Sequence, residues 1–232
     1  MEDSKRVTQD NALISAKYTM TLNEKRLLLA AISKLDPTSK AWKDGKAEVT
    51  ITVHEWVELF KTDRKYSYKQ LREASAALYG RSVRIKGDHL NGKNLRWLQA
   101  EEYSQDKGMV TITFSGVILK YLTSLFDQFT SYDLLGVSGL KSVYSIRLYE
   151  IATQFKNTGW RQVQVNELRG MLGAEGFYPR WAELRRRAVD VAVKELNLKS
   201  DISIDYKIIK EGKEVVAVRL FVKPKDQLEL EL

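Results

Sequence analysis

The first half of the chain shows an ordered series of helical and strand-like hydrophobic patterns. Apolar residues recur at helical spacing in three segments, and Val49, Ile51 and Val53 alternate with threonines as in a half-buried strand. The predicted helices cover 22–35, 54–60 and 66–79, and the predicted strands cover 48–53, 82–86, 95–103 and 109–114. The resulting order is that of a winged-helix domain: a helix, a strand, two helices and a two-stranded hairpin.

The second half of the chain repeats this order. Its predicted helices cover 142–155, 166–172 and 178–196, and its predicted strands cover 161–165, 202–209 and 215–222. Val53 corresponds to Val165, and Leu71 corresponds to Leu184 at nearly the same offset, which indicates an internal duplication. The sequence therefore predicts an α+β fold of two tandem winged-helix domains, residues 1–126 and residues 127–232.

Charge and composition favour a polyanionic partner. The 232 residues include 38 Lys and Arg against 30 Asp and Glu, a net charge of +8, although a basic balance also serves plain solubility. Cysteine is absent, so the chain has no disulfide or thiolate metal site, which fits a reducing cytoplasm. No apolar run approaches the roughly 18 residues of a membrane span. We therefore expect a cytoplasmic protein with no membrane partner.

A near match to a phosphate-binding loop needs a separate explanation. Gly87, Gly92 and Lys93 have the spacing of a P-loop, but Asn94 stands where Ser or Thr would hold the metal. A P-loop lies at a strand-to-helix junction, so that the helix N-terminus faces the phosphates. These glycines lie between two predicted strands. We interpret the segment as the turn of a wing that places Lys86 and Lys93 beside DNA, and we expect no cofactor.

The sequence gives no support for an enzyme. A rolling-circle nickase needs a paired-histidine metal site with a nearby tyrosine, whereas the only histidines, His54 and His89, lie far apart. The Gly-x-Ser-x-Gly elbow of the hydrolases is also missing. We therefore predict no catalytic residue and no metal site.

The predicted helix over 178–196 has the amphipathic pattern of a DNA-recognition helix. Its apolar stripe consists of Trp181, Leu184, Ala188, Val189, Ala192 and Leu196. Its other face carries four basic residues, Arg180, Arg186, Arg187 and Lys194, which could reach a major groove. Arginine suits this role, because its guanidinium can bind guanine O6 and N7 together. An ordinary salt-bridged surface helix is the alternative, and we expect Arg185 in a structural ion pair.

Basic residues also occur at equivalent places in the first domain and in both predicted wings. The helix over 66–79 and the turn before it carry Arg64, Lys65, Lys69 and Arg72, which predict a phosphate clamp. The predicted wings carry Lys86 and Lys93 in the first domain and Lys207, Lys210 and Lys213 in the second. Four basic elements in two repeated domains favour double-stranded DNA as the partner.

Three strings along the chain form a recognisable set. They are Asn11-Ala12-Leu13-Ile14 followed by Leu22, Glu24, Arg26 and Leu27; then Tyr144-Ser145-Ile146-Arg147-Leu148-Tyr149-Glu150; then Trp181-Ala182-Glu183-Leu184-Arg185-Arg186-Arg187. In this order, over nearly the whole chain, they resemble the theta-type plasmid replication initiator (Rep) proteins that bind iterons. The order of the strings is far more specific than any one of them.

The resemblance implies a non-enzymatic initiator. Such proteins bind direct repeats at the plasmid origin as monomers, help to melt an AT-rich stretch, and recruit the host initiator and the replicative helicase. As dimers, they bind an operator with an inverted repeat and repress their own gene. Carried onto this chain, the resemblance assigns base reading to Arg180, Arg186 and Arg187, and backbone contacts and the dimer surface to the first domain. A tandem winged-helix transcription regulator unlinked to replication is the alternative.

Overall fold

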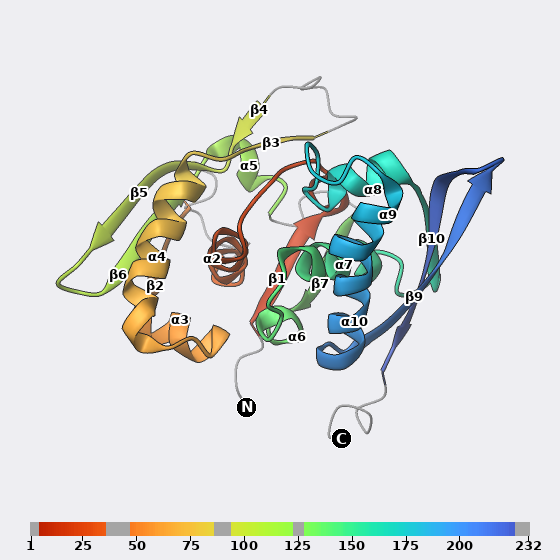
Figure 1. Cartoon of the computed structure of the whole chain (residues 1–232). Coiled ribbons are helices and arrows are strands. Elements are labelled where there is room, and N and C mark those ends of the chain that lie inside the picture. Colours follow the sequence, from red (N-terminus) through yellow and green to blue (C-terminus); the bar gives the residue numbers. More distant parts are fainter. Residues whose placement is uncertain (1–4, 36–46, 86–93, 123–127, 226–232) are drawn as a thin grey trace. The chain divides into compact units, whose positions relative to one another are not determined.

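The chain folds into two compact units (Figure 1). The structure is a computed structural model that describes residues 5–35, 47–85, 94–122 and 128–225. Unit 1 comprises Met1–Leu13 and Met20–Ser138, and unit 2 comprises Ile14–Thr19 and Gly139–Leu232. The division after Ser138 lies later in the chain than the predicted division after residue 126.

Unit 1 contains the winged helix predicted for the first half. Its winged-helix elements are α2 (Leu22–Ile32), β2 (Glu48–Thr52), α3 (Val53–Phe60), α4 (Arg64–Tyr79), β5 (Leu98–Ser104) and β6 (Met109–Phe114). The strands form an antiparallel sheet in the order β2-β6-β5. Val49 and Ile51 lie opposite Ile112 and Val110, and all four side chains are buried. The alternation that predicted the strand therefore places its apolar face in the core.

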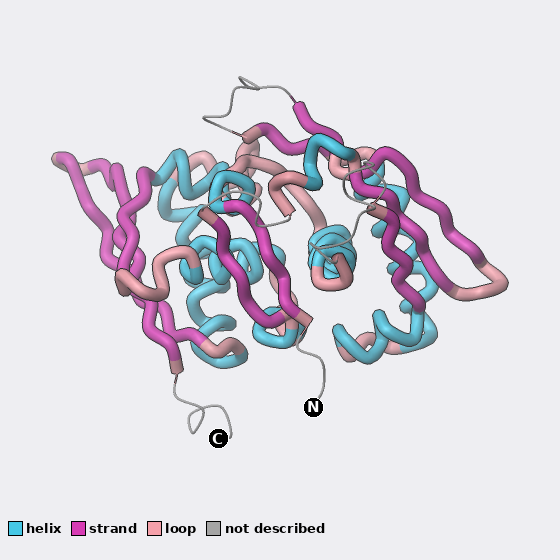
Figure 2. The backbone as a smooth tube through the Cα atoms, turned by 180° about the vertical axis from the view of Figure 1, so that it is seen from behind, coloured by secondary structure: helices cyan, strands magenta, loops and turns pink. Residues whose placement is uncertain are grey.

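Unit 1 also contains two strand pairs and three short helices outside its winged-helix sheet, and among these the hydrophobic pattern predicted only the strand at 82–86 and part of the strand at 95–103. They are the strand pairs β1 (Arg6–Asp10) with β7 (Phe129–Asp133) and β3 (Ser82–Arg84) with β4 (Asn94–Arg96), and the short helices α1 (Asn11–Ile14), α5 (Gly116–Leu119) and α6 (Leu135–Ser138). The predicted strand over 95–103 is divided by Trp97 into β4 and β5. Figure 2 shows these strand pairs from behind.

The pairing of these strands corrects the position of the first wing. The predicted wing turn lies at 87–93, between β3 and β4, but β3 and β4 pair only with each other and do not join the sheet of β2. The hairpin of that sheet is β5–β6, and its turn spans 105–108. Lys86 and Lys93 lie outside the described residues. The one basic residue of the described wing turn is Lys107, which the sequence analysis did not select.

Capping side chains fix the starts of the unit 1 helices. Thr21 and Glu24 form a capping box at α2, and Thr52 and Glu55 form another at α3, so each threonine hydroxyl accepts from a backbone amide that would otherwise lack a partner. Asp63 caps α4 by accepting a hydrogen bond of 2.8 Å from the Lys65 amide. The order of elements is therefore encoded locally, in residues at the helix starts.

Unit 2 contains the second winged helix. Its elements are α7 (Val143–Thr153), β8 (Trp160–Gln164), α8 (Val165–Met171), α9 (Trp181–Leu184), the π-helical segment η2 (Arg185–Val189), α10 (Asp190–Lys199), β9 (Ile202–Glu211) and β10 (Glu214–Pro224). The strands form an antiparallel sheet in the order β8-β10-β9. The β9–β10 hairpin is the long blue pair in Figure 1. Asn166 was the predicted cap of α8, but the N-cap residue is Gln164.

An N-terminal segment completes unit 2. The guanidinium of Arg147, on α7, donates hydrogen bonds to the backbone carbonyls of Ile14 and Ala16 at 2.7 and 3.0 Å and to the Tyr18 hydroxyl at 2.6 Å. It also forms an ion pair with Glu150 at 2.8 Å, and both side chains are almost fully buried. A buried charge needs such partners to offset its desolvation. The segment Ile14–Thr19 is therefore a structural part of unit 2.

Candidate nucleic-acid interface

The predicted recognition helix of unit 2 spans α9, η2 and α10, which we call the arginine helix. Its core side consists of Leu184, Ala188, Val189, Ala192 and Leu196, each with no measurable solvent exposure. The four predicted basic residues are all exposed: Arg180, Arg186, Arg187 and Lys194. None of the four forms an ion pair with a carboxylate among the described residues. Their charges are therefore available to an anionic partner.

Arg180 lies immediately before the arginine helix, at its N-cap position. The loop that leads to it is held by Arg169 of α8, whose guanidinium donates to the carbonyls of Tyr178 at 3.2 Å and Pro179 at 2.9 Å. Arg180 itself makes no capping hydrogen bond with its side chain. The loop therefore fixes the backbone of Arg180 while the guanidinium remains exposed.

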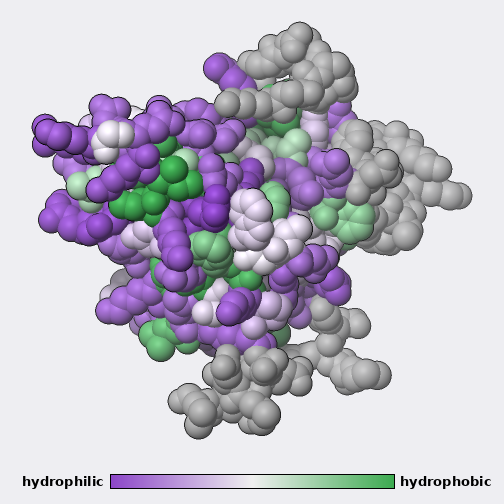
Figure 3. Space-filling model, turned by 90° about the vertical axis from the view of Figure 1, so that its right-hand side faces the viewer, coloured by the Kyte–Doolittle hydropathy of each residue, from purple (hydrophilic) through white to green (hydrophobic). Residues whose placement is uncertain are grey.

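Arg180 and one wing residue line the same hollow of unit 2. This hollow has a volume of about 580 Å³ and lies between the starts of α8 and α9 and the β9–β10 turn. Lys213, from that turn, also lines it. The structure thus brings the N-cap residue of the arginine helix and a lysine of the wing to the same hollow, and both were predicted from the sequence as DNA-binding residues. The surrounding surface of unit 2 is mostly hydrophilic on the side shown in Figure 3.

Two predictions about this region have different outcomes. Trp181 was expected in the buried stripe, but it is only half-buried, lines the same hollow, and lies edge-on to Tyr206 with ring centroids 6.4 Å apart. Leu184, the next residue of the predicted stripe, is fully buried. The predicted ion pair of Arg185 is confirmed, because its Nε lies 3.4 Å from Asp190 Oδ2.

The other two lysines of the second wing occupy different positions. Lys210 is exposed near the end of β9, close to the turn that holds Lys213. Lys207 lies further down the strand, opposite Arg219 of β10, with its ammonium 5.8 Å from the centre of the Phe221 ring. Lys207 is therefore on the surface of the sheet rather than at the tip of the wing.

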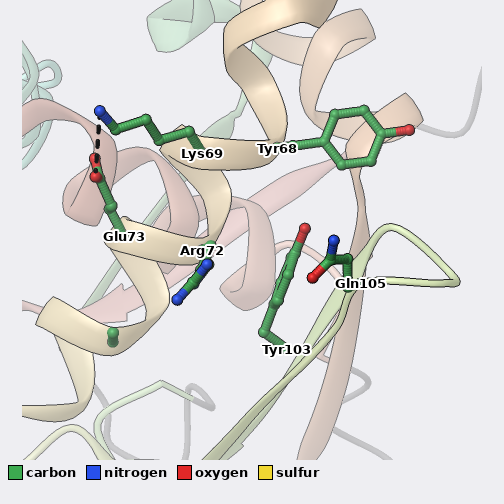
Figure 4. Close-up of a pocket in the computed structure, with 7 residues that line it drawn as sticks. Tyr68, Lys69, Arg72, Glu73, Tyr103 and Gln105 are labelled. Atoms are coloured by element: carbon green, nitrogen blue, oxygen red, sulfur yellow. Dashed lines mark ion pairs between the residues drawn. The ribbon is translucent and has the colours of Figure 1, made fainter.

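The corresponding helix of unit 1, α4, combines basic and aromatic side chains. Arg64, Lys65, Lys69 and Arg72 are all exposed, as are Tyr66 and Tyr68. Lys69 and Arg72 line a hollow of about 780 Å³ together with Tyr68, Glu73, Tyr103 and Gln105. Figure 4 shows Tyr103 and Gln105 rising from β5 and the wing turn toward α4. The Lys69–Glu73 pair is fully on the surface at 3.8 Å, so it provides little stability.

Tyr68 connects α4 with the wing turn of unit 1. Gly108, in this turn, has a positive φ of 57°, a conformation that favours glycine. A Cβ atom at this position would lie 3.0 Å from Tyr68 Cε1. The glycine therefore permits both the turn and the close packing of the tyrosine ring. The wing turn, which carries Lys107, accordingly packs beside Tyr68 of α4.

The described residues contain no group of three or more His, Cys, Asp or Glu side chains that could hold a metal ion. In the same part of the chain, no helix is both long and apolar enough to cross a membrane.

Comparison with known families identifies the two units. The model described as "Initiator Replication protein, WH1" matches residues 6–153, and the model described as "Initiator Rep protein, WH2" matches residues 164–221. The chain belongs to the initiator replication protein family. The fold of this initiator, two tandem winged helices, and its family, the plasmid Rep proteins, are as the sequence analysis predicted.

Individual relatives agree with this family. The initiator is 28% identical over 218 residues to an uncharacterized 27.6 kDa protein of Escherichia coli, a match covering 90% of this chain and 91% of the relative. It is 25% identical to a replication initiation protein of Escherichia coli, covering 85% of this chain and 64% of that protein. Its structure is similar to a crystal structure of the Pi initiator protein in complex with iteron DNA, with a TM-score of 0.81, 23% identity, and coverage of 97% and 100% of the two chains.

Proposed function

We propose that this chain initiates plasmid replication in the cytoplasm by binding direct repeats, or iterons, in double-stranded origin DNA. The observation that carries this proposal is the arginine helix: three exposed arginines on a helix whose other face is buried, within a protein of the initiator family. The Pi initiator protein, which has the same fold, was crystallised with iteron DNA. The function is one of binding rather than catalysis.

In this proposal, the arginine helix reads the base sequence. Arg180, Arg186 and Arg187 would contact base edges in the major groove, because a guanidinium can donate two hydrogen bonds to one guanine. Lys194 lies further along the helix and would contact a phosphate, as would the wing residues Lys207, Lys210 and Lys213.

Unit 1 would hold the DNA backbone. Arg64, Lys65, Lys69 and Arg72 on α4 supply positive charge, and the hydroxyl groups of Tyr68 and Tyr103 around the same hollow can donate to phosphate oxygens. The wing turn adds Lys107 to this set. Lys86 and Lys93 keep their proposed role as phosphate contacts, although they lie outside the described residues.

The resemblance to iteron-binding initiators supports further parts of the proposal. Monomers would bind the direct repeats, whereas dimers formed through unit 1 would bind an inverted repeat and repress the initiator gene. The host initiator and the replicative helicase would be protein partners at the origin. These roles depend on the family rather than on particular residues described above.

The test is a comparison of affinities for duplexes taken from the DNA flanking the gene, with scrambled duplexes of equal length. Arg187→Ala should lower affinity for the cognate direct repeat by about 1 to 3 kcal/mol, and it should lower affinity for scrambled DNA much less. Lys194→Ala should weaken both kinds of binding and reduce the slope of log K against log salt by about one.

Lys223→Ala is a matched control, because Lys223 is exposed near the end of β10 and has no assigned role. If neither Arg180→Ala, Arg186→Ala nor Arg187→Ala changes the ratio of specific to scrambled affinity, the arginine helix is not the reading element. Preference for an inverted repeat, with no binding to direct repeats, would favour the transcription regulator instead.

A further inference from the structure

The arginine helix contains a π turn, η2, between its two α-helical parts. The backbone amide of Asp190 donates to the carbonyl of Arg185, five residues earlier, rather than four. Such single π turns are rare and often occur at functional sites. The turn contains Arg186 and Arg187, two of the three proposed base-reading residues.

The spacing of four buried residues agrees with the π turn. Leu184, Ala188, Ala192 and Leu196 recur every four residues, and all four are fully buried. In an uninterrupted α-helix with 3.6 residues per turn, Leu196 would lie about 120° around the axis from Leu184. One extra residue in a π turn reduces this difference to about 20°. The π turn therefore brings these four side chains nearly into one line along the helix.

A side-chain network from strand β9 holds the same turn. The Tyr206 hydroxyl donates a hydrogen bond of 2.5 Å to Asp190 Oδ1, and Arg185 Nε lies 3.4 Å from Asp190 Oδ2. Arg185 and Asp190 would lie about 140° apart on a regular α-helix, so their ion pair depends on the π turn. Burial, followed by the hydrogen bond to Asp190, raises the pKa of Tyr206 to about 12, so its hydroxyl remains a donor at neutral pH.

We propose that Tyr206, acting through Asp190, is a positioning residue for sequence recognition: it holds the π turn that presents Arg186 and Arg187. This inference rests on the proposed function of the arginine helix. Tyr206 need not contact DNA for this role, because its hydroxyl is already bonded to the helix. The wing strand thus controls the geometry of the reading helix as well as carrying its own basic residues.

The decisive variant is Tyr206→Phe, which removes the hydroxyl and keeps the ring that faces Trp181. We expect about a tenfold loss of affinity for the cognate repeat, because a hydrogen bond to a charged group is lost. Affinity for scrambled DNA should remain within about twofold, since the exposed charges remain. A variant that was merely less folded would lose both affinities in proportion. Tyr79→Phe, at the end of α4, is the control tyrosine.

Asp190→Asn and a double-mutant cycle complete the test. Asp190→Asn keeps an oxygen that can accept from Tyr206, so its loss of specificity should be smaller than that of Asp190→Ala. In an Arg187→Ala background, Tyr206→Phe should have less than about a threefold effect, because contacting or coupled residues are non-additive. Full additivity, or an unchanged specificity ratio in Tyr206→Phe, would overturn the inference. If instead the arginine variants also leave this ratio unchanged, the proposed function itself has failed.

Discussion

Helix α4 of unit 1 and the arginine helix of unit 2, the two candidate recognition helices, follow the same order of elements but differ in how they begin and how they continue. Helix α4 of unit 1 has a capping aspartate and continues as a regular α-helix of 16 residues. The arginine helix of unit 2 begins at Arg180 without a side-chain cap and widens into a π turn. Unit 1 thus has the more regular helix, whereas the helix of unit 2 lacks a side-chain cap at its start and carries exposed arginines in its π turn. The two units of the duplicated fold therefore carry helices of different regularity.

The largest expected effect tests the buried leucine that each of the two helices carries at the matched position. Leu71 and Leu184 are matched positions, and neither is exposed. Leu71→Ala and Leu184→Ala should each lower the free energy of unfolding of their own unit by about 2 to 5 kcal/mol, because each leaves a cavity. Urea unfolding measures both. Leu198→Ala is the control, since Leu198 is 74% exposed. If Leu184→Ala and Leu198→Ala lower the free energy of unfolding equally, the assignment of Leu184 to the buried face of the helix is wrong.

A smaller effect tests the difference between the two helix starts. Asp63→Ala should lower the free energy of unfolding by about 1 kcal/mol, because the Lys65 amide loses its acceptor. Arg180→Ala should leave stability nearly unchanged, and Arg180→Asp should raise it by up to about 1 kcal/mol by introducing a cap. The same Arg180→Asp change should weaken DNA binding. Thermal unfolding and DNA affinity should be measured on the same samples. If Arg180→Asp is more stable and still binds DNA with wild-type affinity, Arg180 does not contact the DNA.

The smallest expected effect concerns acid. Desolvation by burial raises the pKa of Glu55, at the start of α3, and of Glu195, but hydrogen bonds to each carboxylate outweigh it, so both pKa values are lowered. Glu195 accepts from the backbone amides of Lys141 and Ser142, which precede α7. A carboxylate with a lowered pKa stabilises the fold above its ordinary value of 4.5, and this contribution is lost as pH falls through the folded pKa. Glu55→Gln and Glu195→Gln should therefore flatten the loss of stability below about pH 4.5, measured by urea unfolding across pH. If the free energy of unfolding falls as steeply below pH 4.5 in both variants as in the unchanged protein, neither carboxylate contributes to this pH dependence.

The sequence predicted the winged-helix elements because their signals are local. Alternation in β2 and β6, helical spacing in α4, and the matching of Leu71 with Leu184 all lie within short windows. The strand β1 was missed because its partner β7 is more than 100 residues away, and its own sequence is mostly polar. Long-range pairing leaves little local trace.

The exposure of the basic residues in the candidate site was predictable from the sequence, but their geometry was not. The basic residues of both helices are exposed as predicted, yet the first wing lies at 105–108, because the strands paired differently than expected. The four-residue repeat of Leu184, Ala188, Ala192 and Leu196 was visible and could have revealed the π turn. The anchor of that turn, Tyr206, comes from a distant strand, so its role required the structure.

The segment Ile14–Thr19 makes unit 2 discontinuous in the gene. A fragment that begins at Gly139 would lack three of the oxygens that accept hydrogen bonds from Arg147, the carbonyls of Ile14 and Ala16 and the hydroxyl of Tyr18. It would also expose the surface around Gly170 and Gly173, where a Cβ would lie 2.6 Å from Lys17 and Tyr18 atoms. Such a fragment should fold only when a peptide covering 14–19 is supplied or fused to it. We therefore expect that exchange of the C-terminal domain between initiators preserves function only when the segment 14–19 is exchanged with it.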